Sequence, residues 1–95
     1  ETLSAAEAHS SGLIWKCVDD DCLQDEVEAT VRRLTELPAQ GLALTKRALT
    51  AAAANDFAEQ LVLEAQLQTV AGRSPDYAEA VSAFVEKRTP NFKND

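Results

Sequence analysis

Apolar residues recur every three or four positions along most of this 95-residue chain, which is the spacing of one face of an α-helix. The stripes are Leu23, Val27, Val31 and Leu34 in 22–37; Leu42, Leu49 and Ala52 in 39–54; Phe57, Leu61, Leu63, Leu67 and Val70 in 56–71; and Tyr77, Val81 and Phe84 in a helix that begins at 75. The pattern predicts four amphipathic helices, and the apolar face over 56–71 is broad.

Start and stop signals agree with these segments and add a short helix at the N-terminus. Ser4 followed by Glu7 is the pattern of a capping box, and Gly12 suits the end of such a helix. The later boundaries are, in order, Pro38, Asn55 with Asp56, Gly72, Ser74 with Pro75, and Pro90. Pro90 is expected to stop the last helix. About five helices joined by short links predict an all-α fold.

The segment 13–18 differs from the rest, because it is apolar and partly β-branched without a helical period. It predicts an extended link or a short strand near residue 15. The acidic run Asp19–Asp21 follows, and acids ahead of a helix favour its positive N-terminal end. A metal site is the less favoured interpretation, since no ligand loop follows the run.

Composition and charge narrow the function. The chain is 45% hydrophobic and 26% charged, as in ordinary globular proteins. A formal net charge of −7 argues against a nucleic-acid partner. No apolar run approaches the roughly 20 residues of a membrane span. Cys17 and Cys22 match no zinc or redox spacing and His9 lacks partner ligands, so we expect no metal and reduced thiols, as in a cytoplasmic protein.

The apolar stripes exceed what a chain of this length can bury. Some helix faces are therefore expected to cover another surface, either of a longer parent chain or of a neighbouring subunit. No nucleophile elbow, glycine-rich phosphate loop or His-centred triad stands in the sequence. The residues alone thus indicate an interaction or oligomerisation module.

Short motifs follow one another in order through the whole chain. They are Leu3-Ser4-Ala5-Ala6-Glu7-Ala8; Gly12-Leu13-Ile14; Pro38 to Lys46 with Ala48-Leu49; Glu64 with Gln68; and Asp76, Glu79-Ala80, Ala83-Phe84, Glu86-Lys87-Arg88, Pro90 and Phe92. Together they resemble the C-terminal region of the crotonase (enoyl-CoA hydratase/isomerase) superfamily. Within it, residues 12–20 and 71–77 look most like the phenylacetate-degradation branch, whose enzyme isomerises a ring-epoxide of phenylacetyl-CoA to an oxepin.

The resemblance implies an acyl-CoA thioester as substrate and no separate cofactor. In the family, two backbone N–H groups form an oxyanion hole for the thioester enolate, and acidic side chains move the protons. No residue of this chain matches the family's catalytic carboxylates, so none is assigned as catalytic. The resemblance therefore implies that the N-terminal catalytic core would lie upstream of residue 1, and that residues 1–95 alone are inactive.

For the helices, the resemblance implies a role in trimer formation and in covering the active site, with a homo-oligomeric parent (trimer or hexamer). Phe84 and Lys87 match the Phe and Lys that reach the adenosine end of coenzyme A in many members, where an adjacent subunit holds most of that ligand. Arg88 and Lys93 would make the local field positive. The alternative is that Phe84 is a core residue of its stripe and Lys87 is simply solvated.

Four interpretations stay open on the sequence. The leading one is the C-terminal part of an acyl-CoA isomerase of phenylacetate or fatty-acid catabolism. The parent could instead be an enoyl-CoA hydratase. A free-standing helical oligomerisation or adaptor module and a coenzyme A-binding protein without chemistry complete the set.

Overall fold

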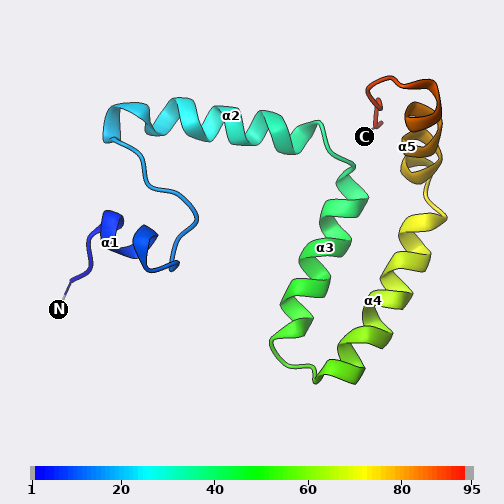
Figure 1. The fold of residues 1–95 in the computed structure, drawn as a ribbon, viewed down its shortest axis with the longest axis horizontal. Helices are drawn as coiled ribbons and strands as arrows, with labels where there is room; N and C mark the ends of the chain where they lie inside the picture. Colours follow the sequence, from blue (N-terminus) through cyan, green and yellow to red (C-terminus); the bar gives the residue numbers. More distant parts are fainter. Residues whose placement is uncertain (1, 94–95) are drawn as a thin grey trace. The chain divides into compact units, whose positions relative to one another are not determined.

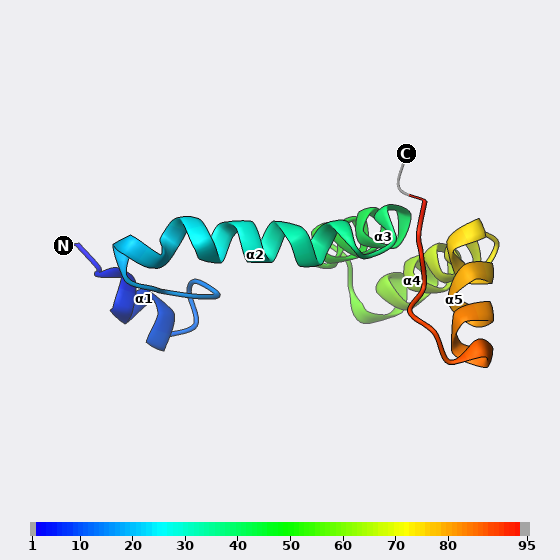
Figure 2. The ribbon, with the colours of Figure 1, turned by 90° about the horizontal axis from the view of Figure 1, so that it is seen from above.

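Residues 2–93 are described by a computed structural model, and within that range every regular element is a helix (Figure 1; Figure 2 gives the view from above). The elements are α1 Ala5–Ser10, the 3₁₀ turn η1 Asp20–Cys22, α2 Leu23–Thr35, α3 Ala39–Ala52, α4 Phe57–Gly72 and α5 Pro75–Glu86. The all-α prediction with five α-helices is confirmed. The chain divides into two units, Glu1–Arg32 and Arg33–Asp95.

Helix α1 is closed at both ends by local hydrogen bonds. The Glu7 N–H donates to Ser4 Oγ at 3.1 Å, and Ser4 Oγ donates to the Glu7 carboxylate at 2.8 Å. The Glu7 side chain thus returns to the cap hydroxyl rather than to the cap backbone. At the other end, the Leu13 N–H reaches the Ala8 carbonyl at 2.9 Å, and Gly12 has a left-handed φ of 80°. This is a Schellman motif, as the glycine predicted.

The expectation of a strand near residue 15 is wrong for the described part of the chain. Residues 13–18 pair with no other extended segment of the described range, and a strand needs such a neighbour for its backbone hydrogen bonds. The alternative was an extended link; the segment is a link, but residues 13–15 form bends rather than an extended chain. Lys16 of this link pairs with Glu26 of α2 at 2.5 Å, and its ammonium lies 5.7 Å from the centre of the Trp15 ring.

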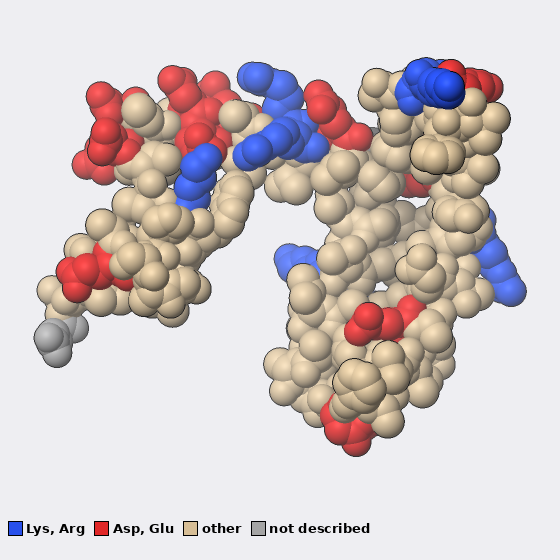
Figure 3. All heavy atoms as spheres, viewed as in Figure 1, with Lys and Arg blue, Asp and Glu red and all other residues tan. Residues whose placement is uncertain are grey.

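Helix α2 begins directly after the acidic run. Asp20 and Asp21 lie in η1, and Asp25 and Glu26 lie in the first turn of α2. Figure 3 shows acidic side chains gathered over the first half of α2 and basic ones over the second, which is the order that the helix dipole favours. The interpretation of the run as a helix start is confirmed.

Helices α3 and α4 form a hairpin in the second unit (Figure 1). A full capping box starts α4, because the Glu59 N–H donates to Asp56 Oδ1 at 2.8 Å and the Asp56 N–H donates to the Glu59 carboxylate at 3.1 Å. The Gln60 side chain then donates to the Ala48 carbonyl of α3 at 3.0 Å. Leu67 of α4 is 7% exposed and is the largest buried side chain among the described residues.

Most of the predicted apolar positions remain exposed within this chain. Phe57 at the start of α4 is 80% exposed, and the stripe of α2 is exposed throughout. The buried apolar residues of the described range are only Ala8, Leu67 and Ala83. The stripes therefore lie on helices, as predicted, but the chain does not supply the surfaces that would cover them.

Helix α5 begins as predicted and ends earlier than predicted. The Tyr77 N–H donates to Ser74 Oγ at 3.2 Å, and Pro75 is the first helical residue. The helix ends at Glu86, so Pro90 is not what stops it. Lys87 turns the backbone out of the helix instead, and the tail then runs back along α5 (Figure 2).

Candidate functional site

Phe84 lies in the last turn of α5 and is 85% exposed. Its neighbour Ala83 is the buried residue of this helix, at 1% exposure. Successive residues of a helix point about 100° apart, so the face that Ala83 turns inward leaves Phe84 outside. The interpretation of Phe84 as a core residue therefore does not hold within this chain, and a flat apolar ring is available at the surface.

Lys87 lies just beyond α5, in a left-handed conformation with φ 58° and ψ 43°. Its N–H donates to the Phe84 carbonyl at 3.3 Å, and the N–H of Arg88 donates to the Ala83 carbonyl at 3.0 Å. These two bonds form a second Schellman motif. Lys87 is thus not a helical residue; it lies at the end of the helix, three positions after Phe84.

The Lys87 side chain is exposed and forms no ion pair with any of residues 2–93. Figure 3 shows basic and acidic side chains side by side over this end of α5. An ammonium without a carboxylate partner can bind a phosphate without first breaking an ion pair.

Arg88 ties the tail to the helix. Its guanidinium donates two parallel hydrogen bonds to the Glu79 carboxylate, at 2.6 and 3.0 Å, and Nε donates to Glu86 at 2.5 Å. The same Glu79 carboxylate accepts the backbone N–H of Asn91 at 2.7 Å. We call Glu79, Arg88 and Asn91 the tail clasp; bidentate pairs of this kind are among the stronger and most directional polar contacts.

The tail clasp shifts the pKa values of Glu79 and Arg88. The hydrogen bonds from Arg88 and then from the Asn91 backbone lower the pKa of Glu79 from 4.5 to about 2. The bonds to Glu79 and Glu86 raise the pKa of Arg88 above its ordinary value. The expectation that Arg88 adds positive field is therefore wrong, because two carboxylates neutralise its charge.

The contacts of the tail clasp are not predicted by the sequence pattern. Glu79 and Arg88 lie nine positions apart, a separation that matches neither the i+3 nor the i+4 spacing of helical ion pairs. The contact depends on the reversal of the backbone at Lys87. The left-handed residue of this reversal is a lysine and not a glycine, so the sequence gives no usual signal for it. An acid one turn into a helix and an arginine just past its end are the only signal that the sequence offered.

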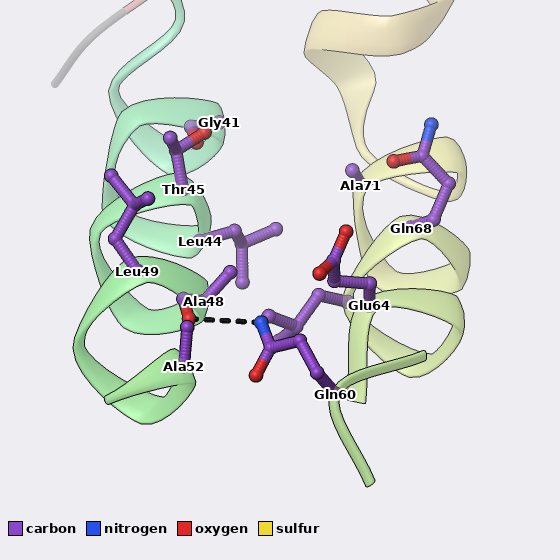
Figure 4. Close-up of a pocket in the computed structure, with 11 residues that line it drawn as sticks. Gly41, Leu44, Thr45, Ala48, Leu49, Ala52, Gln60, Glu64, Gln68 and Ala71 are labelled. Atoms are coloured by element: carbon purple, nitrogen blue, oxygen red, sulfur yellow. Dashed lines mark hydrogen bonds between the residues drawn. The ribbon is translucent and has the colours of Figure 1, made fainter. Parts of the chain in front are cut away.

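A second feature is an open hollow of about 460 Å³ between α3 and α4 (Figure 4). Its lining is mostly small or apolar, and its acidic member is Glu64, whose carboxylate points toward α3 (Figure 4). The Gln60 bond to Ala48 closes one end. No second ionisable group lines this hollow, so it lacks the pair that acid–base chemistry needs.

Two further classes of site are absent from residues 2–93. No three His, Cys, Asp or Glu side chains gather where they could hold a metal ion. None of the helices in this range combines the length and the apolarity of a membrane span.

Comparison with known proteins gives the family. The enoyl-CoA hydratase/isomerase family model matches residues 1–95. The chain belongs to the enoyl-CoA hydratase/isomerase family. It is 48% identical over 90 residues to the 1,2-epoxyphenylacetyl-CoA isomerase of Escherichia coli, covering 95% of this chain and 34% of that protein.

Other members of the family agree with this placement. The probable enoyl-CoA hydratase of Rhodobacter capsulatus is 40% identical over 92 residues, covering 97% of this chain and 36% of that protein. A crystal structure of an enoyl-CoA hydratase/isomerase from Mycobacterium paratuberculosis superimposes with a TM-score of 0.92 at 27% identity, over 100% of this chain and 37% of that one. The chain thus spans about a third of the length of these family members, and its helices superimpose on those of the solved structure.

Proposed function

We propose that residues 1–95 serve as the C-terminal helical region of an acyl-CoA isomerase or hydratase. In this role the end of α5 contacts the adenosine end of coenzyme A, and exposed helix faces contact other parts of the enzyme. Family membership over residues 1–95 supports the acyl-CoA class. The catalytic step is assigned to no residue here, and we expect the chain alone to be inactive.

The observation that carries the proposal is that Phe84 and Lys87 lie at the same helix end, where the Lys87 N–H donates to the Phe84 carbonyl at 3.3 Å. The ring of Phe84 is 85% exposed, and an exposed aromatic ring is a stacking surface for a base such as adenine. The ammonium of Lys87 has no carboxylate partner among residues 2–93, which suits a phosphate group. Coenzyme A presents an adenine and phosphates together at its adenosine end.

Exposed apolar faces support the second part of the role. Phe57 of α4 and Leu49 of α3 are 80% and 71% exposed, although both belong to helical stripes. Faces of this kind mark surfaces that pack against another protein surface. We propose that they take part in the assembly of a homo-oligomeric enzyme, a trimer or hexamer.

The reaction proposed first is isomerisation, of the kind that the phenylacetate-degradation branch performs. Its support is the higher identity to the E. coli isomerase, 48%, against 40% to the R. capsulatus hydratase. An enoyl-CoA hydratase is the second candidate. A free-standing helical module is the third, and the intact mass of the protein in its source organism separates it from the other two.

The test uses the full-length enzyme that contains these residues. Lys87→Gly removes the ammonium while keeping a residue suited to the left-handed backbone, and it should raise KM for acyl-CoA several-fold with kcat unchanged, because about 1 kcal/mol of charged contact is lost. Phe84→Ala should act in the same direction. A substrate shortened to the pantetheine thioester should show neither effect.

A matched charge control is Lys46→Ala, which removes an exposed lysine of α3. It should leave KM unchanged with both substrates. If Lys87→Gly and Phe84→Ala also leave KM for acyl-CoA at the parent value, the proposed coenzyme A contact is wrong.

A further inference from the structure

Two helices of this chain end in the same Schellman motif, with different residues at the left-handed position. At the end of α1 that residue is Gly12, with φ 80°; at the end of α5 it is Lys87, with φ 58°. Glycine adopts this conformation freely, whereas any other L-residue is disfavoured there by the clash of its Cβ with the following carbonyl. A lysine at such a position persists only where its surroundings hold it.

Besides the two backbone bonds of the Schellman motif, the surroundings of Lys87 include the tail clasp. Glu79 lies inside α5, while Arg88 and Asn91 lie beyond it, and both bind the one Glu79 carboxylate at 2.6–3.0 Å. The chain must therefore reverse between the end of α5 and Asn91 (Figure 2). Lys87 is the left-handed residue at that reversal. The clasp fixes where the Lys87 backbone lies relative to the last turn of the helix.

The two neighbouring cations, Lys87 and Arg88, differ in their ion pairs. Arg88 pairs with the carboxylates of Glu79 and Glu86 at the surface, so its charge is balanced within the chain. Lys87 remains without an ion-pair partner in the described range. Arg88 is thus tied to the helix, whereas Lys87, three positions after the exposed Phe84, is not.

We propose that Glu79 and Arg88 are positioning residues, which hold Lys87 in its left-handed turn so that its ammonium and the Phe84 ring meet the adenosine-phosphate end of an acyl-CoA together. The inference rests on the proposed function of Lys87. Neither Glu79 nor Arg88 touches the ligand; both act through the backbone of Lys87.

The experiment is a double-mutant cycle in the full-length enzyme, with KM and kcat measured for acyl-CoA and for the pantetheine thioester. Glu79→Ala should raise KM for acyl-CoA about five-fold, as should Lys87→Gly, with kcat unchanged. The double variant should be no worse than either single one, because Glu79 acts only through Lys87. Glu86→Ala is the matched control: it removes a carboxylate from Arg88 but leaves the tail bound to Glu79, and should leave KM unchanged.

Hydrogen exchange measured by mass spectrometry on the same variants gives a readout without ligand. Glu79→Ala should speed exchange of the amides from Arg88 to Asn91 at least ten-fold, and Glu86→Ala should not. Unchanged exchange in Glu79→Ala would overturn the inference, because the clasp would not be holding the tail.

The kinetic outcomes separate the two proposals. If Lys87→Gly raises KM and Glu79→Ala does not, or if the two effects multiply in the double variant, the positioning role is wrong and the coenzyme A contact stands. If Lys87→Gly itself leaves KM unchanged, the coenzyme A contact fails, and the positioning role fails with it.

Discussion

Lys87 occupies a backbone conformation in which glycine is the favoured residue. We predict that Lys87→Gly makes the protein about 0.5–1 kcal/mol more stable than Lys87→Ala, because glycine relieves the left-handed strain that alanine keeps. Urea denaturation of the two variants measures the difference. The same pair of substitutions at Lys46, inside α3, should show the opposite sign, with glycine about 1 kcal/mol less stable than alanine. Equal signs at the two positions would contradict the prediction.

The second prediction at the residue scale concerns the pH dependence of the tail clasp, which follows the pKa of Glu79. Its pKa is lowered from 4.5 to about 2, so the stabilisation from the tail clasp should be fully present above pH 4.5 and lost as the pH falls through about 2. The Asn91 amide, followed by NMR during an acid titration, should therefore change with a midpoint near 2 and not near 4.5. Glu79→Gln has no charge to titrate and should abolish this transition.

At the scale of the elements, α1, α4 and α5 each start with a side-chain cap bond, and the capping box of α4 is the most complete. Asp56→Ala removes the acceptor for the Glu59 N–H and should destabilise the α3–α4 hairpin by about 1 kcal/mol. Asp56→Asn keeps an acceptor of the same shape and should lose much less. Thermal melting followed by circular dichroism compares the two, and an equal loss in both would show that the cap bond is not what matters.

For the whole molecule, the shortage of buried surface is the dominant property. Leu67 is the one large side chain of residues 2–93 that is buried, while Phe57, Leu61 and Val70 of the same helix are exposed. We predict that the isolated chain self-associates through these faces, since burying apolar area is worth about 25 cal/mol per Å². Light scattering at about 100 μM should show more than one chain per particle, and the melting temperature should rise with concentration. A strict monomer with concentration-independent melting would contradict this.

Local signals determined much of this protein from the sequence alone. The spacing of apolar residues predicted the helices, and Ser4, Gly12, Asp56, Ser74 and Pro75 marked their ends to within a few positions. The order of motifs also indicated the family, which the match over residues 1–95 shows. The helices and their ends could be predicted because each depends on residues three or four positions apart, within one turn of helix.

Contacts between distant residues were decided by tertiary structure. The strand expected near residue 15 is absent from the described range, since a strand depends on a partner that the local pattern cannot supply. Likewise, Pro90 indicated a later end for α5, whereas the chain turns at Lys87 and brings Arg88 and Asn91 back to Glu79. Phe84 could have been core or surface by its stripe alone. Its exposure was settled only by which face of α5 packs inward, and that depends on the position of the neighbouring helix rather than on the order of residues in this one.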